Sequence, residues 1–262
     1  MTFALVQTSL EIPPTDALKR AFRSVQSLTD HDAHVLAADA FGILVKNLPG
    51  NEAATVQQAL RAEAIETEII PQAQLPQIPP GKFVRRIQCT AESLLVHDAL
   101  GRPFPVEWRH LSMIAAGKVR VQEFNRVRNE RKVTRYTAEG YAYTDTEVDY
   151  SSREQSNFQH LMEIFVGRNA LRYSIQADKP FLFQHLGERF NPDLDQSVAL
   201  VVRELAQFAP HAAINRGTHY LREGAGPFSY PSKNAFTEEL IWLLWRLQRL
   251  EDARGSQAGT IQ

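Results

Sequence analysis

The sequence contains almost no cysteine and no long apolar run, and each absence excludes a class of protein. Cys89 is the single cysteine among 262 residues, so neither an internal disulfide nor a thiolate metal cage can form. No hydrophobic stretch approaches the roughly 18–20 residues that cross a membrane. The first ten residues lack the basic and apolar segments of a signal peptide. We therefore expect a cytoplasmic protein without a membrane-spanning segment.

Motifs for common cofactors and catalytic groups are also missing. The sequence has no dinucleotide-binding glycine pattern, phosphate-binding loop, zinc-protease motif or hydrolase nucleophile motif. His31 and His34 share a predicted helix face, but a metal site needs a third ligand, and a capped first turn explains the run. Cys89 lies in an alternating stretch and is expected to be a small buried residue. No cofactor, metal or catalytic residue is predicted, and the favoured interpretation is not an enzyme.

What the sequence does contain is an ordinary globular composition over more than one domain length. Hydrophobic residues make up 44% and charged residues 23%, which is enough apolar material for packed cores. The length exceeds the roughly 100–200 residues of one domain, so two domains are expected. The formal net charge is −1, so attraction to nucleic acid or membranes requires a local cluster of charge.

Residues 1–72 predict a small βααβαβ domain. Apolar residues recur at helical spacing in three stretches, and short apolar runs bounded by proline, glycine or capping residues separate them. We predict, in order, a strand at residues 3–6, helices at 15–28 and 29–40, a strand at 43–45, a helix from about residue 51 and a strand at 67–70.

Residues 41–70, FGILVKNLPGNEAATVQQALRAEAIETEII, resemble the end of the C-terminal domain of the ribosomal stalk protein. The two-helix opening before them is similar to the layout of the related protease adaptor ClpS. The resemblance implies the βααβαβ fold and a tendency toward protein–protein contact. ClpS binds destabilising N-termini through an Asn-Asp pair after the first strand, but residues 9–14 here read SLEIPP. Recognition of N-termini is therefore not expected.

Residues 73–82 are rich in proline and form the expected linker, because proline neither continues a helix nor fits a central strand. Apolar and polar residues then alternate, as in strands. The fold class expected for the chain is α+β, with an antiparallel β-barrel-like second domain at 83–250, C-terminal helices that close it and a disordered tail at 251–262. We predict strands at 83–90, 93–99, 104–108, 111–121, 160–166, 171–177 and 181–183, and closing helices at 195–208 and 233–250.

Residues 93–114, SLLVHDALGRPFPVEWRHLSMI, resemble the opening of pleckstrin-homology-like and GRAM-like barrels, in which a strand turns at a glycine and a tryptophan precedes the next apolar strand. The resemblance implies a barrel closed by a terminal helix. Lipid phosphates in such barrels contact basic residues of the first hairpin loop. The loops here offer only Arg102, or Arg85 and Arg86, so phosphoinositide binding is not expected.

A charged insertion at about 122–158 interrupts the strand pattern, with a basic first half and an acidic, tyrosine-rich second half. A solvated insertion whose halves loosely neutralise each other is the simplest interpretation, since exposed ion pairs contribute about 0–1 kcal/mol each. The alternatives are a protein-partner surface and, least favoured because the whole chain is neutral, nucleic-acid contact through residues 118–135. The candidate partner residues in the basic half are Arg126, Arg128, Arg131, Lys132 and Arg135.

The helix predicted at 233–250 is apolar on nearly all sides, which is typical of a helix placed between layers or against a partner. Two interpretations stay open. The helix packs against the rest of the chain, or Trp242 and Trp245 anchor a homodimer seam or a partner groove.

These patterns favour a non-enzymatic interaction or adaptor protein with an unknown protein partner. The first alternative is a small-ligand or metal-dependent enzyme with a site between the domains, built from His97, His110 and His185. The second is nucleic-acid binding through the basic run at 118–135. Clustering of the histidines in space would favour the enzyme over the adaptor.

Overall fold

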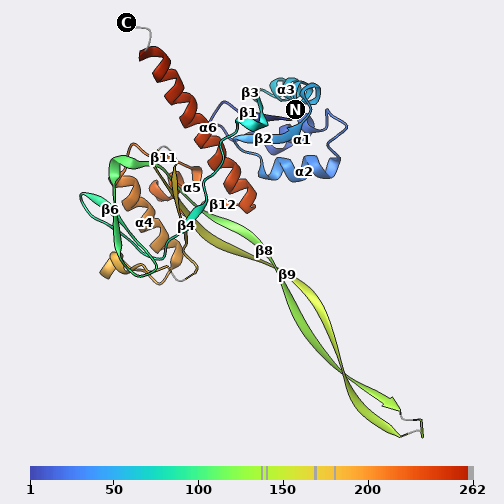
Figure 1. Cartoon of the computed structure of the whole chain (residues 1–262). Coiled ribbons are helices and arrows are strands. Elements are labelled where there is room, and N and C mark those ends of the chain that lie inside the picture. Colours follow the sequence, from blue (N-terminus) through green and yellow to red (C-terminus); the bar gives the residue numbers. More distant parts are fainter. Residues whose placement is uncertain (137, 140, 168–169, 180, 259–262) are drawn as a thin grey trace. The chain divides into compact units, whose positions relative to one another are not determined.

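The structure, a computed structural model, describes residues 1–136, 138–139, 141–167, 170–179 and 181–258 (Figure 1). Within these ranges, the side chains at 123–128, 136, 143, 145, 150–155 and 254–258 lie outside the described set. The fold class is α+β, as predicted. The chain divides into a first unit, Met1–Val119 with Gln159–Gln262, and a second unit, Arg120–Phe158.

The N-terminal part of the first unit contains the six predicted elements in the predicted order. Its three strands form an antiparallel sheet in the order β2-β1-β3. Leu5, Phe22, Leu44 and Leu60 lie in the core between this sheet and the helices. The elements are β1 (Phe3–Gln7), α1 (Thr15–Phe22), α2 (Asp30–Asp39), β2 (Ile43–Leu48), α3 (Gly50–Ala62) and β3 (Thr67–Pro71).

Helix α1 is shorter than the predicted helix at 15–28. It ends at Phe22, yet Val25 is buried and Leu28 packs against the same core. The apolar spacing that predicted a longer helix therefore reflects turn residues that also reach the core. At the start of α2, Thr29 and Asp32 form a reciprocal capping box, which confirms the capped first turn proposed for the run at His31.

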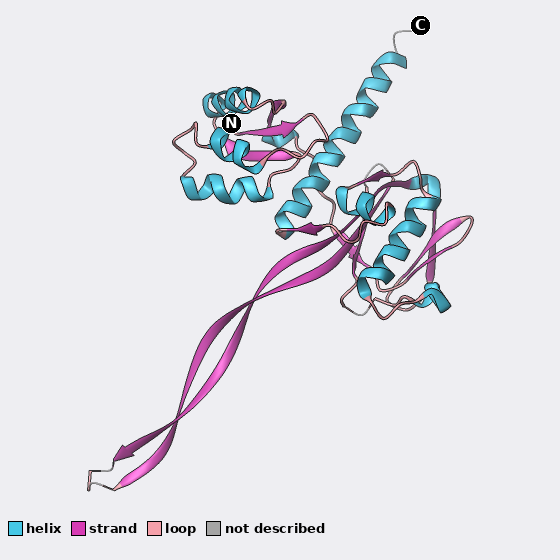
Figure 2. Ribbon diagram, turned by 180° about the vertical axis from the view of Figure 1, so that it is seen from behind, coloured by secondary structure: helices cyan, strands magenta, loops and turns pink. Residues whose placement is uncertain are grey.

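The remaining strands of the first unit form two sheets. One has six strands, in the order β11-β8-β9-β10-β4 with β12 beside β8, and the other has the order β5-β6-β7 (Figure 2). β4, β11 and β12 each pair in parallel with their neighbours. The strands are β4 (Gly81–Phe83), β5 (Ile87–Cys89), β6 (Ser93–His97), β7 (Pro103–Glu107), β8 (Leu111–Tyr136), β9 (Ala142–Val166), β10 (Leu171–Gln176), β11 (Ala213–Ile214) and β12 (Ser229–Tyr230).

The prediction of an antiparallel barrel is wrong in this respect: the described strands form no closed barrel, and parallel pairs are mixed with antiparallel ones. The predicted strand at 83–90 is broken between Phe83 and Ile87, so its halves, β4 and β5, join different sheets. The predicted strand at 181–183 is absent as well. Leu182 makes an isolated bridge to Arg86 instead.

Three helices complete the first unit: α4 (Leu194–Phe208), α5 (Arg216–Arg222) and α6 (Lys233–Ala258). Val201, Val202 and Leu205 of α4 lie in the second core, together with strand residues such as Ile164 and Leu94. The predicted disordered tail is wrong for 251–258, which continue α6; residues 259–262 lie outside the described residues. None of the described helices is long and apolar enough to cross a membrane.

The second unit consists of residues 120–136 of β8 and 142–158 of β9 with the turn between them, and we call residues 120–158 the ribbon. The charged insertion predicted at about 122–158 is thus a continuation of two strands that begin in the first unit. Arg120 Nε donates to Ser156 Oγ across the ribbon at 2.6 Å. Charge did not prevent strand formation, because none of the ribbon side chains that the structure describes is buried.

Candidate functional site

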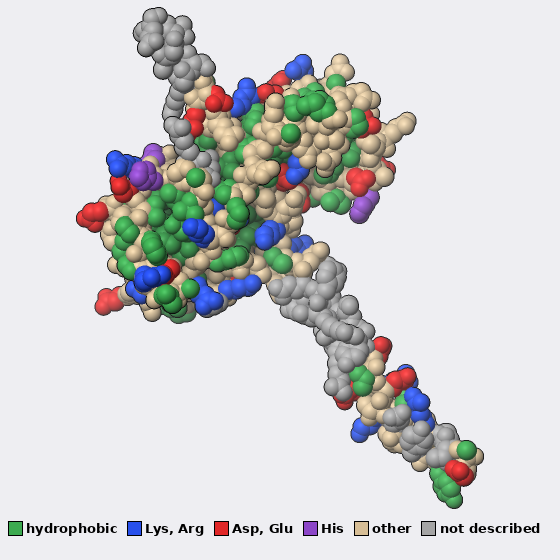
Figure 3. All heavy atoms as spheres, in the orientation of Figure 1, with side chains coloured by type: hydrophobic (Ala, Val, Ile, Leu, Met, Phe, Trp, Pro, Cys, Tyr) green, Lys and Arg blue, Asp and Glu red, His purple; other side chains and the backbone are tan. Residues whose placement is uncertain are grey.

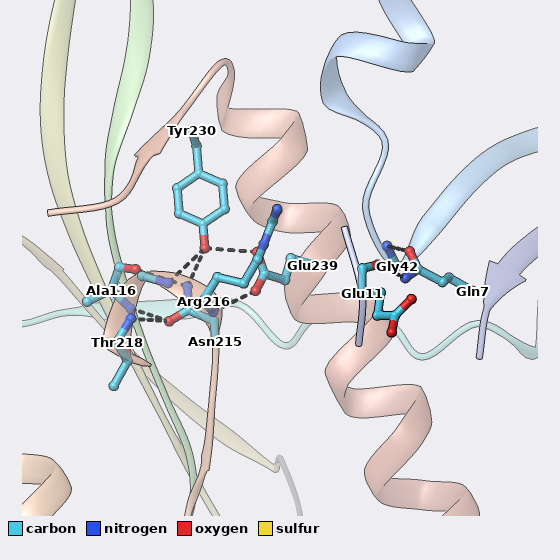
Figure 4. Close-up of polar contacts among 10 residues, drawn as sticks. Gln7, Glu11, Gly42, Ala116, Asn215, Arg216, Thr218, Tyr230 and Glu239 are labelled. Atoms are coloured by element: carbon cyan, nitrogen blue, oxygen red, sulfur yellow. Dashed lines mark hydrogen bonds and ion pairs between the residues drawn. The ribbon is translucent and has the colours of Figure 1, made fainter. Parts of the chain in front are cut away.

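A buried polar network lies between β8, α5, β12 and α6 (Figure 4). The Tyr230 hydroxyl donates to Glu239 Oε2 at 2.8 Å, and it accepts from Asn215 Nδ2 at 2.8 Å. Arg216 donates to the same carboxylate from its backbone N at 2.7 Å and from Nε at 2.9 Å. Tyr230, Asn215 and Glu239 are buried. Such a network stabilises one arrangement of these elements because each buried polar group has a partner.

Local sequence places this network. Asn215 caps α5 by accepting from Thr218 N, and its amide also bonds the backbone N and O of Ala116 in β8. Gly217 follows because the backbone there approaches β8 closely: a Cβ at this position would lie 1.8 Å from the Ala116 carbonyl oxygen. Glycine is therefore the residue that lets α5 begin against the sheet.

The network is structural, because its donors and acceptors are used by one another. Burial, with the Glu239 carboxylate beside it, raises the pKa of Tyr230 well above its ordinary value, so the hydroxyl stays protonated and donates. The Arg216 guanidinium carbon lies 3.6 Å from the centre of the Phe41 ring. This cation–π contact joins the network to the N-terminal sheet region.

Helix α6 packs against the N-terminal domain, which is one of the two arrangements that the sequence left open. Trp242 Nε1 donates to the Gln7 carbonyl at 2.8 Å, and the Trp242 ring contacts Phe41 edge-on with centroids 5.1 Å apart. Gly42 accommodates the indole, since a Cβ there would lie 2.5 Å from it. Trp242 is 1% and Trp245 8% exposed. Both residues are therefore covered by this chain, and neither is displayed as an anchor for a homodimer or a partner.

The other candidate partner residues lie in the ribbon. Arg131, Lys132 and Arg135 are exposed. Arg126 and Arg128 fall within β8, but their side chains lie outside the described set.

His97, His110 and His185, the histidines proposed for an enzyme site, each lie in a different local setting. His97 Nδ1 contacts the Gly101 carbonyl in the β6–β7 hairpin, and His185 lies in the 3-10 helix Gln184–Arg189. His110 lines a cavity of about 310 Å³ with His211, Ser112 and Glu251. Among the described residues, no group of three or more His, Cys, Asp or Glu side chains could hold a metal ion.

A different histidine, His160, does sit in a charged cluster. Its Nδ1 lies 2.8 Å from Asp178 Oδ1, and its Nε2 contacts Asp195 Oδ1. Lys118 Nζ lies 3.0 Å from the second oxygen of Asp195. Burial alone would lower the pKa of His160, but its hydrogen bonds to the two aspartates outweigh burial and hold the pKa above its ordinary value. Sequence order gave no signal for this cluster, because its members come from four segments that lie far apart in the chain.

Cys89 is not an activated nucleophile. Burial raises the pKa of its thiol to about 12, with the Glu204 carboxylate acting in the same direction, so the thiolate is scarce at neutral pH. Glu163 is also buried, and burial raises its pKa to about 7. The Ser174 hydroxyl donates to its Oε1 at 2.9 Å.

The structure has two neighbouring cavities that the sequence did not predict. Phe181, Leu182, Phe183 and Phe190 line one of about 390 Å³. Phe83, Arg85, Lys179 and Phe181 line a second of about 160 Å³. The run Phe181-Leu182-Phe183 was interpreted as a strand, and its aromatic pairing with later residues is visible only in three dimensions.

Comparisons with known proteins indicate neither a family nor a function for the chain. No protein-family model, curated protein or solved structure matches the chain. The resemblances to the stalk-protein and ClpS fold and to pleckstrin-homology-like and GRAM-like barrels stay predictions.

Proposed function

We propose that this is a non-enzymatic protein-interaction protein and that the ribbon is its partner-binding element. The observation that supports this proposal is exposure to solvent. Within residues 120–158, none of the side chains that the structure describes is buried. A two-stranded ribbon without a third layer is marginally stable in water. Exposed Tyr141, Val148 and Phe158 gain free energy when another surface covers them.

The backbone of the ribbon favours the same role. β12 pairs with β8 as far as Val119, and β10 pairs with β9 from Leu161 onward. Between these points the described sheet consists of β8 and β9 alone. The outer edges of such a ribbon are templates for an added strand, which is a common mode of protein recognition.

The charges of the ribbon favour a protein over nucleic acid. Residues 120–158 contain seven Lys and Arg and seven Asp and Glu, so their formal net charge is zero. Six of the seven basic residues precede residue 137, and four of the acidic residues follow residue 141. A phosphate backbone requires a net positive surface, whereas a protein partner can match both signs.

The test is deletion of the ribbon. Residues 120–158 are replaced by a short turn containing Asn-Gly, a sequence that favours tight hairpins. We expect unchanged circular dichroism and a melting temperature within a few degrees of wild type, because no described side chain of the ribbon is buried. In affinity capture scored by quantitative mass spectrometry, we expect the captured proteins to be lost.

A matched control retains the ribbon and changes exposed charge elsewhere, by Arg222→Ala and Arg23→Ala, and should capture the same proteins as wild type. Light scattering of the purified proteins identifies the case in which the partner is a second copy. Equal capture with and without the ribbon, or a monomeric wild type that captures nothing above empty resin, would contradict the proposal.

A further inference from the structure

Two cavities share one wall at the end of the six-stranded sheet, and their linings differ in chemistry. The larger, about 390 Å³, is lined by Phe181, Leu182, Phe183 and Phe190, with Gln184 and Gly187 at its border. Its lining is mostly apolar, and its volume falls within the range of small-ligand sites, about 300–1,000 Å³. Phe181 also lines the smaller cavity of about 160 Å³, so the two lie side by side.

The walls of the larger cavity are fixed by backbone and ring contacts. Leu182 N donates to the Arg85 carbonyl at 2.7 Å, and Phe181 and Phe183 meet edge to face with centroids 4.8 Å apart. Phe183 and Phe190 follow with centroids 6.0 Å apart. Leu186, which lies between them in sequence, is buried in the second core. These contacts fix residues 181–190 in place, although apolar side chains of this segment stay exposed to solvent.

Several large apolar side chains around the cavities remain in water. Phe83 is 74%, Phe190 50% and Leu182 45% exposed. Full burial of one such side chain contributes about 1.5–3 kcal/mol, so their joint exposure at one place indicates a surface that binds something. Hydrophobic side chains with Lys and Arg between them are visible over the part of the first unit that carries β6 and α4 (Figure 3).

The smaller cavity supplies positive charge. Arg85 and Lys179 line it together with Gln176, and neither cation makes an ion pair in the part of the chain that the structure describes. His185 lies in the adjoining segment. Burial lowers its pKa to about 4, and the charges of Arg189 and Arg86 act in the same direction. Both ring nitrogens of His185 are buried without a hydrogen-bond partner.

We propose that the two cavities form one binding site for a small amphipathic anion, a carboxylate on a medium-length apolar chain. The chain would occupy the larger cavity against Phe183 and Phe190. The carboxylate would occupy the smaller cavity between Arg85 and Lys179. A free small molecule fits this arrangement better than a bilayer does, because both the apolar and the cationic groups line recesses.

The test is calorimetric titration of the whole protein with decanoate below its micelle-forming concentration. Arg85→Ala with Lys179→Ala removes the charge that would bind the carboxylate, and we expect Kd to rise about tenfold or more, which is 1.4 kcal/mol for each factor of ten. Decanamide, which has the same chain without the charge, should bind this variant as it binds wild type. Phe190→Ser should weaken both ligands, and rising salt should weaken decanoate alone.

Matched controls on other exposed residues are Leu100→Ser and Arg222→Ala, which should bind decanoate as wild type does. Phe190→Trp gives a local probe, and its emission should shift when decanoate binds. Saturable binding with these dependences supports the site. Absence of saturable binding, equal affinity of wild type and the Arg85 and Lys179 variant, or equal affinity for decylammonium would overturn it. Binding to phosphatidylglycerol vesicles without binding of free decanoate would overturn it in favour of a membrane surface.

Discussion

The network around Glu239 makes a quantitative prediction about stability. Tyr230→Phe removes one hydroxyl oxygen with little change in shape. Asn215 Nδ2 still donates to the Ala116 carbonyl, and Glu239 Oε2 still accepts from Arg216, whereas Gly217 N, which donates to the Tyr230 hydroxyl at 3.3 Å, loses that acceptor. We therefore expect a loss of about 1–2 kcal/mol, within the range for an unmade buried hydrogen bond.

Glu239→Gln should cost more, because it removes the charge that compensates Arg216. Removing one partner of a buried ion pair costs about 3–5 kcal/mol. We expect the lower part of that range, because the Arg216 side chain is 18% exposed and water can solvate part of the guanidinium. Tyr230 and Arg216 donate to the same oxygen of Glu239. The double variant should therefore cost less than the sum of the single variants, by about 0.5–3 kcal/mol.

Urea unfolding followed by tryptophan fluorescence measures these changes, because Trp242 is buried against the N-terminal domain and Trp245 is also buried. The transition midpoint should fall while its slope stays constant. Tyr220→Phe, at a partly exposed ring, is the control and should change stability by less than about 0.5 kcal/mol. Strict additivity of the two substitutions, or a larger loss from Tyr230→Phe than from Glu239→Gln, would refute the description of the network as one unit.

Three other predictions concern separate parts of the chain. Gly42→Ala should destabilise the protein by about 2–4 kcal/mol in the same urea assay, because Gly42 has φ +76° and the Trp242 indole occupies the place of a Cβ. The control Gly224→Ala, at φ +77° with nothing near the Cβ position, should cost about 1 kcal/mol. Similar losses at both positions would mean that backbone strain alone matters. The raised pKa of His160 stabilises the fold fully below the unfolded pKa of about 6.5, and this contribution is lost as pH rises through the pKa of the folded state. His160→Gln should therefore reduce the fall in unfolding free energy over that pH range. An unchanged pH profile would show that the cluster is not coupled to folding. Burial raises the pKa of Glu163 from 4.5 to about 7, so the unfolding free energy also falls as pH rises between these two values. Wild type and His160→Gln should share that part of the pH profile. Cys89, with its pKa raised to about 12, should react with iodoacetamide at pH 8 far more slowly in folded protein than in urea, and equal rates would contradict its burial.

Sequence patterns predicted the N-terminal domain well because its signals are local. Helical apolar spacing, a Thr29 cap and short strands bounded by glycine or proline all agree with the final packing. The second domain was harder because its strands pair over long distances. β4 and β5 read as one strand, and β11, β12 and the short helix α5 are only two to seven residues long. Segments this short carry too little periodicity to be recognised.

The candidate sites depended even more on tertiary structure. The ribbon has strand pairing without the apolar alternation that marks a half-buried strand, because no described side chain in it is buried. The aromatic run from Phe181 to Phe183 reads as a strand, yet it lines a cavity. The apolar pattern around Trp242 and Trp245 allowed both packing within the chain and partner binding, and the contacts of Trp242 with Gln7, Phe41 and Gly42 are visible only in three dimensions.

The contact between Trp242 and Gln7 also bears on how the chain folds during synthesis. The two residues are 235 positions apart, so the N-terminal sheet emerges from the ribosome long before the helix that covers it. Until α6 is made, Phe41 and the surface around Gly42 stay exposed on an otherwise complete domain. Late, long-range contacts slow folding and leave intermediates prone to association. We therefore expect nascent chains that stop before residue 233 to bind chaperones, and release to follow completion of α6.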